Sequence, residues 1–416
     1  MEETASGPDD LEEAARRRGW PEGLLQRAVG LRVPRAVIQR WLTQPWGGPE
    51  YVQRRIDWHD RLTFGTLRGR EATRADNEAF ADLWANAPEE IGDWEITNER
   101  GPNAFAQFRL QENVVLLVIE EAGQLIASCS FAAHKVVCGA KRLTVHYGQA
   151  LRVRKEYRGQ GYGDQVRSLP WSVGAGRPTH GQYDITRSEN FAIVDWWKKY
   201  APAFFDNVPE RAGAVPGIPV TVLQYPPRPF EGDPSGIRKA RPADLGRCVG
   251  LINRTQRGLD IIRPYSREFL QDRLDDGFWG DPHPDWSWPA VYGWPDYYVL
   301  EEQGRVVACA GLWDRGRDMR DRFRNKVTGE EKVISVTAVL DFGYEAGQEA
   351  SIARLIAFLI GETHRLRRDY LTIPLDQLPA LAERLDEYEP VPETRSLRWG
   401  VEQVSIARPH VDLSYW

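Results

Sequence analysis

Residues 151–171 read LRVRKEYRGQGYGDQVRSLPW, and this is the most informative stretch of the chain. An apolar strand end runs into Arg158-Gly159-Gln160-Gly161-Tyr162-Gly163, and the following residues are typical of a helix. Glycine lets the backbone adopt positive φ angles and approach a ligand closely. The free N–H groups of such a loop, and of the first turn of the helix behind it, converge on an anion such as a phosphate. The alternative is a tight strand-to-helix turn that binds nothing.

Two other glycine-rich phosphate motifs are excluded by the residues that follow. The dinucleotide-binding fingerprint GxGxxG needs a third glycine at position 166, which is Val166. A P-loop needs Gly-Lys-Ser or Gly-Lys-Thr, and neither follows the loop.

The elements around the loop are predicted from hydrophobic periodicity and turn signals. The order is strand, helix, three strands, glycine loop, helix, strand and helix, and we expect an α/β fold with a mixed sheet. The predicted elements are a strand at Leu67–Ala72, a capped helix start at Thr73–Asp76 with apolar Phe80, Leu83 and Trp84, strands at Leu116–Glu120, Gln124–Ala132, Leu143–Val153 and Tyr183–Thr186, and a helix at Phe191–Tyr200.

In this context the loop resembles the acyl-coenzyme A loop of the GNAT superfamily of N-acyltransferases. The family pattern is Arg or Gln, two residues, Gly, one residue, then Gly or Ala, and Arg158, Gly161 and Gly163 fill its required positions. The resemblance covers roughly residues 65 to 225. It implies that acetyl-CoA or another acyl-CoA is the co-substrate.

The length of 416 residues suggests two or three domains. The predicted divisions are a helical N-terminal extension (1–60), a GNAT catalytic domain (61–225), a proline-rich linker (226–236) and a second, GNAT-like domain (237–416). The second domain is expected because the pattern restarts, with Gly236–Leu245, a hairpin of Tyr297–Leu300 and Val306–Leu312, a strand at Val333–Phe342, a helix at Ser351–Arg367 and a strand at Tyr370–Ile373.

The second domain is predicted to be a degenerate copy in a tandem arrangement. Its loop, Asp341–Gln348, has neither the leading Arg or Gln nor the close pair of glycines. Asp341 and Glu345 are expected to stand where a pyrophosphate would be repelled.

The resemblance also implies a set of residues that hold the coenzyme. Backbone groups of Leu151, Arg152 and Val153 are expected to pair with its pantetheine arm. Asn190 is expected to hold the same arm, with a helix N-cap as its alternative role. The full expected set is Leu151, Arg152, Val153, Arg158, Gly159, Gln160, Gly161, Tyr162, Gly163, Asp164, Asn190 and Trp197.

The catalytic acid and base are harder to assign. Many family members carry a carboxylate on the strand that matches Leu143–Val153, but this strand has none, so His146 is the preferred base and His134 the second candidate. A hydrogen-bonded structural role is the alternative for both. The family's acid, a Tyr seven residues after the Asn, is replaced by Trp197, and Tyr200 substitutes only if the helix is rotated or shifted.

These features predict an N-acetyltransferase, or other N-acyltransferase, that acylates a primary amine of a small molecule. A peptide or protein acceptor is the first alternative, and a non-catalytic acyl-CoA sensor is the second, favoured by Trp197 and by the missing carboxylate. The segment Phe278–Tyr298, with Trp279, Trp286, Trp288 and Trp294, suits either a cationic amine or an irregular loop pinned to a domain interface.

Charge and composition limit the other possibilities. The net charge is −6 and the pI is about 5.8, which argues against nucleic acid as the main partner, although arginines are spread along residues 9–46. We expect a cytoplasmic protein without a membrane span, because no signal-peptide pattern or long apolar run is present. The four cysteines lack metal-site spacing and are predicted to be buried thiols, so no metal is expected.

Overall fold

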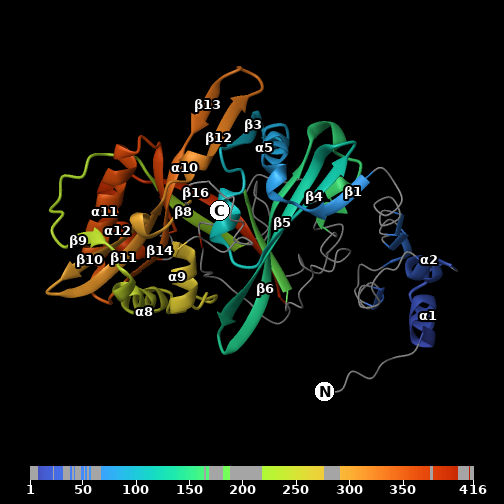
Figure 1. Ribbon diagram of the computed structural model, residues 1–416, viewed down its shortest axis with the longest axis horizontal. Coiled ribbons are helices and arrows are strands. Elements are labelled where there is room, and N and C mark those ends of the chain that lie inside the picture. Colours follow the sequence, from blue (N-terminus) through green and yellow to red (C-terminus); the bar gives the residue numbers. More distant parts are fainter. Residues whose placement is uncertain are drawn as a thin grey trace.

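The computed structural model describes residues 8–21, 23–30, 38–39, 42, 48–50, 52–53, 56–57, 67–163, 165–167, 181–187, 218–275, 291–374, 378–401 and 412. Within these residues twelve strands form one mixed sheet (Figure 1). In spatial order they are β1 (Leu67–Glu71), β4 (Val114–Glu121), β5 (Gln124–Cys138), β6 (Lys141–Val153), β7 (Gly181–Arg187), β16 (Val391–Val401), β8 (Ile218–Tyr225), β15 (Tyr370–Ile373), β14 (Val336–Tyr344), β11 (Arg305–Trp313), β10 (Tyr297–Glu302) and β9 (Ile237–Lys239).

The sheet has the same sequence of pairings when it is followed from either edge. Three antiparallel pairings come first, then one parallel pairing, then antiparallel pairings to the centre. The parallel pairing is short on both sides: β6 pairs with β7 at three positions, and β14 pairs with β15 at three positions. The two halves of the sheet therefore have matching topology.

The two central strands cross between the halves. β16 is the last strand of the chain, yet it pairs with β7 of the first half on one side and with β8 on the other. β8 in turn pairs with β15 of the second half. This exchange was not anticipated from the sequence.

A second sheet also joins the halves. It has four strands in the order β13 (Glu331–Ile334), β12 (Met319–Asn325), β3 (Trp94–Arg100) and β2 (Glu89–Ile91). β12 follows the short helix α10 (Arg315–Asp318), and it pairs with β3 along its whole length. Figure 1 shows the β12–β13 hairpin standing beside β3, above the main sheet.

Helices cover both faces of each half. α5 (Asn77–Ala85) lies on one face of the first half, and residues 162–163 and 165–167 form helix on the other. In the second half α8 (Leu245–Thr255) and α9 (Arg267–Asp275) pack on one face, and α11 (Glu349–Arg365) and α12 (Pro379–Arg384) pack on the other. α1 (Pro8–Arg17) and α2 (Leu24–Gly30) share a separate small core with other residues up to Ile56.

Both halves begin with the same ion-pair arrangement. Arg70 Nη1 lies 2.7 Å from Asp76 Oδ2, and Arg70 Nη2 lies 2.9 Å from Glu120 Oε2. In the second half the corresponding distances from Arg238 are 2.7 Å to Asp244 Oδ2 and 2.8 Å to Glu301 Oε2. Each arginine thereby ties the first strand to the helix start and to the neighbouring strand.

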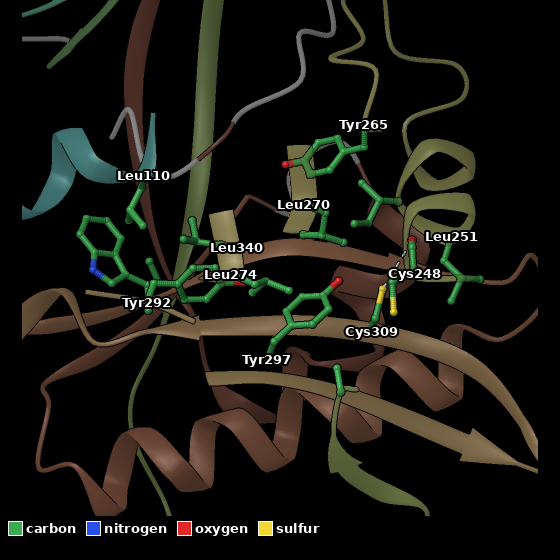
Figure 2. Packing of buried hydrophobic residues seen from close by; sticks show 14 of the residues in the cluster. Leu110, Cys248, Leu251, Tyr265, Leu270, Leu274, Tyr292, Tyr297, Cys309 and Leu340 are labelled. Carbon is green, nitrogen blue, oxygen red and sulfur yellow. Dashed lines mark hydrogen bonds between the residues drawn. The ribbon is translucent and has the colours of Figure 1, made fainter. Parts of the chain in front are cut away.

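The core of the second half continues into the first. Figure 2 shows Tyr297 beside Cys248 and Cys309, with Leu110 of the first half in the same buried cluster. All four cysteines, Cys129, Cys138, Cys248 and Cys309, are buried free thiols, as predicted.

Most of the expected elements are confirmed, including the α/β class with a mixed sheet, the two hairpins and the helix that buries Phe80, Leu83 and Trp84. The single strand expected at Val333–Phe342 is wrong: it divides at Ser335 into β13 and β14, which lie in different sheets. Within the described residues no helix is both long and apolar enough to cross a membrane.

A glycine on β14 allows α8 to pack directly on the sheet. A Cβ at Gly343 would collide with the backbone of Leu251 and Ile252, which cannot move aside as a flexible side chain does. Gly343→Ala should therefore lower the free energy of unfolding by about 3 kcal/mol or more, the upper end of overpacking costs, measured by denaturant titration. A Cβ at Gly246, in α8, would have no heavy atom within 4 Å, so Gly246→Ala should leave stability unchanged or raise it slightly. Equal stability of the two variants would contradict this packing.

Candidate functional site

A β-bulge interrupts β6 beside the centre of the first half. Ser130 is opposite Gln149, and Ser128 is opposite Arg152, so β6 carries one more residue than β5 between these two pairs. Ala150, inside the bulge, has a φ of 57°. Such a bulge turns backbone groups out of the regular ladder, and bulges are common next to active sites.

Among the strands that the structure describes, none lies beside β6 on its β7 side beyond the bulge. Pairing between the two strands stops at Tyr147 and Tyr183, while β7 continues alongside β16 as far as Arg187. In the described part of the chain, residues 148–153 therefore pair with β5 alone. Unpaired strand edges offer N–H and C=O groups to an extended ligand.

The glycine loop follows β6 after the short 3-10 helix Lys155–Tyr157. Gly159 and Gly161 have φ angles of 75° and 85°, in the region that favours glycine. The carbonyl of Gly161 accepts a hydrogen bond from the Gln165 N–H at 3.1 Å, so the helix starts directly at the loop. The expected strand, glycine turn and helix are thus present in this order.

Side chains of the loop hold it in place. Arg158 donates hydrogen bonds to the carbonyls of Pro88 and Val153, and it lies 3.3 Å from Glu90 Oε1 on β2. Tyr162 is buried in the core with its ring 5.7 Å from that of Tyr157. Arg158 and Tyr162 therefore position the loop, and Tyr162 has only its backbone to offer a ligand. Gln160 is exposed and donates to the carbonyl of Glu156 at 3.2 Å.

Arg152 leaves β6 on the face covered by α5. Its guanidinium carbon lies 4.4 Å from the centre of the Trp84 ring, and that of Arg100 lies 3.7 Å from the same ring. Leu151 and Val153, on either side of Arg152, pack against the opposite cluster that contains Tyr162.

The two candidate bases lie on opposite faces of the sheet. His146 is buried, with its ring centroid 6.1 Å from that of Phe131, on the face of the glycine-loop helix. His134 is on the α5 face, where the Tyr183 hydroxyl lies 2.8 Å from its Nε2. The two histidines therefore lie on different sides of the strands that carry them.

Several predicted site residues fall outside the described residues: Asp164, Asn190, Trp197 and Tyr200, together with Trp279, Trp286 and Trp288 of the tryptophan-rich segment. Trp294 of that segment is described. Its Nε1 donates to Asp275 Oδ1 at 2.7 Å, and its ring packs on the core of the second half. For Trp294, this arrangement favours a packing role over contact with a cationic amine.

The second half has the same bulge, but different side chains surround it. Cys309 is opposite Gly343 and Gly311 is opposite Leu340, and Asp341 inside the bulge has a φ of 51°. Four residues, 345–348, then separate β14 from α11. Eight residues, 154–161, separate β6 from the helix that begins at 162.

The expectation that Asp341 faces a phosphate position is wrong. Its carboxylate is buried, because the bulge turns it into the core, where Arg273 Nη1 lies 2.8 Å away and the hydroxyls of Tyr265 and Tyr292 donate at 2.8 and 3.0 Å. The Tyr297 hydroxyl also donates to the Asp341 carbonyl at 2.9 Å. The bulge of the second half is thereby occupied by side chains.

Glu345, the other acidic residue of that loop, is ion-paired. Its Oε2 lies 3.0 Å from Arg247 Nη2 and 2.7 Å from Arg305 Nη2. In the described residues no group of three or more His, Cys, Asp and Glu side chains is arranged to hold a metal ion.

The fold has known counterparts. N-myristoyltransferase from Saccharomyces cerevisiae with bound myristoyl-CoA superposes with a TM-score of 0.55 at 11% identity, over 80% of this chain and 82% of that chain. The same enzyme with myristoyl-CoA and inhibitors gives 0.55 at 12% identity, over 80% and 79%. A GCN5-related N-acetyltransferase from Anabaena variabilis gives 0.41 at 11% identity, over 80% and 72%. The chain shares the fold of the yeast N-myristoyltransferase. Its sequence matches no protein-family model and no curated protein.

A cluster of ion-paired side chains lies where β7, β8 and β16 meet. Glu393 Oε1 lies 2.8 Å from Arg395 Nη2 and 3.4 Å from Arg187 Nη1, and Gln224 donates to Oε2 at 2.6 Å. Burial alone would raise the pKa of the Glu393 carboxyl, but the two guanidinium groups outweigh it and bring the pKa to about 2.

These ion pairs should make the free energy of unfolding depend on pH in the acidic range. The folded-state pKa of Glu393 is lower than its unfolded value of about 4.3, so its contribution is complete above that pH and is lost as pH falls toward 2. Glu393→Gln should lower the free energy of unfolding at pH 7 by about 3 kcal/mol, with the difference shrinking between about pH 5 and 2. Glu331→Gln, at an exposed pair, should change little at any pH. Denaturant titrations across this range would refute the assignment if both variants behave alike.

Proposed function

We propose that the chain is an acyl-CoA-dependent N-acyltransferase that acylates a primary amine of a small molecule, with its site in the first half. The observation that carries the proposal is the combination on β6 of a bulge at Ala150, an unpaired edge and a glycine loop that opens a helix. A ligand with an extended amide arm and a pyrophosphate matches that combination. The yeast enzyme of similar fold is crystallised with myristoyl-CoA, which supports an acyl-CoA as co-substrate.

Each part of the site has a role in this proposal. Backbone groups of Leu151, Arg152 and Val153 would pair with the pantetheine arm, and N–H groups at Gly161 to Gly163, with Asp164, would face the pyrophosphate. Backbone N–H groups at the bulge would lie near the thioester oxygen and would stabilise negative charge on it as the amine attacks. Asn190 and Trp197 would contact the coenzyme arm, and Tyr200 would supply a proton to the thiolate.

We further propose that the chain is a tandem of two such units, the second of them degenerate, at 61–225 and 237–416. Matching topology, matching ion pairs at Arg70 and Arg238, and matching bulges support a duplication. The short loop at 345–348 and the buried side chains around Asp341 support loss of coenzyme binding in the second half.

Two alternatives to this function differ in the acceptor and in whether the site catalyses a reaction. A peptide or protein acceptor is one alternative, and a non-catalytic acyl-CoA sensor is the other, supported by the absence of a carboxylate on β6. Coenzyme A release measured against a panel of amines and peptides separates these, because a sensor binds acyl-CoA without turnover.

Coenzyme A should bind once per chain, at the first glycine loop. Gly161→Asp should abolish binding in calorimetry, because a carboxylate would enter a loop whose N–H groups face phosphate. Gly347→Asp is the matched control: its φ of 81° resembles the 85° of Gly161, and it has open space around it, so backbone strain is similar in both. Two equivalent sites, or equal losses in both variants, would overturn the assignment to the first half.

His146 should act as the general base. An amine with a pKa near 10 is almost wholly protonated at neutral pH and must lose a proton before it attacks. His146→Ala should lower kcat about 100-fold, remove the acidic limb of the rate profile and leave coenzyme affinity unchanged. Retention of more than about half of the wild-type rate would transfer the role to His134, whose own Ala variant should then show the loss.

A further inference from the structure

Three arginines gather on the α5 face of the site, each from a different element. Arg100 ends β3, Arg152 follows the bulge on β6, and Arg315 starts α10 in the second half. The guanidinium groups of Arg100 and Arg152 both contact the ring of Trp84, and the charges of Arg152 and Arg315 both act on Arg100. We call Arg100, Arg152 and Arg315 the arginine cluster.

The three arginines share the carboxylates of Asp321, Glu89 and Glu393, and the last two of these also lie beside Arg187. Arg100 is buried with only 8% of its surface exposed, and it forms no ion pair with a carboxylate of the described residues. Its Nη groups donate instead to the Ala104 carbonyl and to Gln107 Oε1, at 3.1 and 3.2 Å, and its Nε has no hydrogen-bond partner within the described ranges.

The other two arginines have weak or shared partners. Arg152 Nη2 is 3.9 Å from Glu89 Oε2, a carboxylate that also lies 3.5 Å from Arg187 Nε. Arg315 Nη1 is 3.4 Å from Asp321 Oδ2, and Asp321 accepts a hydrogen bond from Asn98. The Nε of Arg315 is buried and has no hydrogen-bond partner among the residues that the structure describes.

The guanidinium groups repel one another. Burial, and then the positive charges of Arg315 and Arg152, lower the pKa of Arg100 well below its ordinary value, and the charge of Asp321 only partly opposes that shift. Burial also lowers the pKa of Arg152, with Glu89 opposing the shift and Arg187 adding to it. Burying cations without counter-charges is costly, and an anion brought among them would remove much of that cost.

We infer that the arginine cluster binds an anionic group, a carboxylate or a phosphate, carried by the acyl acceptor. Guanidinium groups recognise both anions with paired N–H donors. This inference rests on the proposed acyltransferase function and narrows its acceptor to an amine that also carries a negative charge.

The alternative source of the anion is the coenzyme's own phosphates, and the geometry favours the acceptor. Arg152 points to the α5 face, whereas Leu151, Val153 and the glycine-loop helix pack together on the opposite face. The loop that suits a pyrophosphate and the arginine cluster are thus on different sides of β6. A group bound by the cluster would hold its molecule across the bulge from the coenzyme loop.

The first test measures anion binding without turnover. Inorganic phosphate should raise the unfolding temperature of the wild-type protein relative to chloride at equal ionic strength. Arg100→Gln and Arg315→Gln should each lose most of this rise, and Arg324→Gln, whose side chain is 62% exposed, should keep it. Gly161→Asp should keep the share of this rise that comes from the arginine cluster, because it removes only phosphate binding at the coenzyme loop. The same rise in all variants, or none in the wild type, would overturn the anion site.

The second test identifies the source of the anion. With acetyl-CoA as donor, kcat/KM for β-alanine should exceed that for propylamine, and kcat/KM for phosphoethanolamine should exceed that for ethanolamine. Arg100→Gln should lower the values for the anionic amines about tenfold or more, as expected for loss of a charged hydrogen bond, and leave those for the neutral amines unchanged. Coenzyme A affinity of Arg100→Gln should equal that of the wild type.

The outcomes separate the two proposals. A tenfold loss of coenzyme A affinity in Arg100→Gln would assign the cluster to the coenzyme and overturn the acceptor inference. Equal use of anionic and neutral amines by the wild type would overturn it as well. Failure of the acyltransferase proposal would appear separately, as absent coenzyme A binding in a protein that phosphate still stabilises.

Discussion

The hydrogen bonding of β16 on both of its edges is the constraint on which the rest of the molecule depends. β16 pairs with β7 from Arg395 to Val401 and with β8 from Val391 to Leu397. Without it, β7 would have only its three pairs with β6. Each hydrogen bond contributes about 1 kcal/mol net, so the two ladders outweigh most single contacts. Because β16 draws β7 along itself, the edge of β6 is left open where the proposed ligand would lie.

The same bulge has opposite consequences in the two halves because of the residues that surround it. In the first half the positive-φ residue is Ala150, which has no polar group, and the position opposite Ser128 is Arg152. In the second half these positions are Asp341 and Gly343. Gly343 lets α8 approach the sheet, and Asp341 draws a buried arginine and two tyrosines into the space. Shared topology therefore gives an open edge in one half and a closed core in the other.

Sequence reasoning succeeded where the signal is local. The glycine loop, the hairpins and the helix that buries Phe80 are each contained in fewer residues than one domain, and their turn residues and periodicity are visible. It failed where the paired residues are far apart in the sequence. The exchange of β8 and β16, and the bond of Asn98 to Asp321 across 223 positions, leave no local pattern. Asp341 was misread because a bulge reverses the face to which a strand residue points.

The arginine cluster belongs to neither half alone, which links binding to the assembly of the molecule. Arg100 and Arg152 come from the first half and Arg315 from the second, and the β3–β12 ladder brings them together. Their mutual repulsion opposes that ladder when no anion is present. A bound anion would relieve the repulsion and stabilise the junction by an amount that grows with its concentration relative to its dissociation constant. Anion binding and the pairing of β3 with β12 would then be energetically coupled, because Arg315 comes from one half of the sheet and Arg100 and Arg152 come from the other.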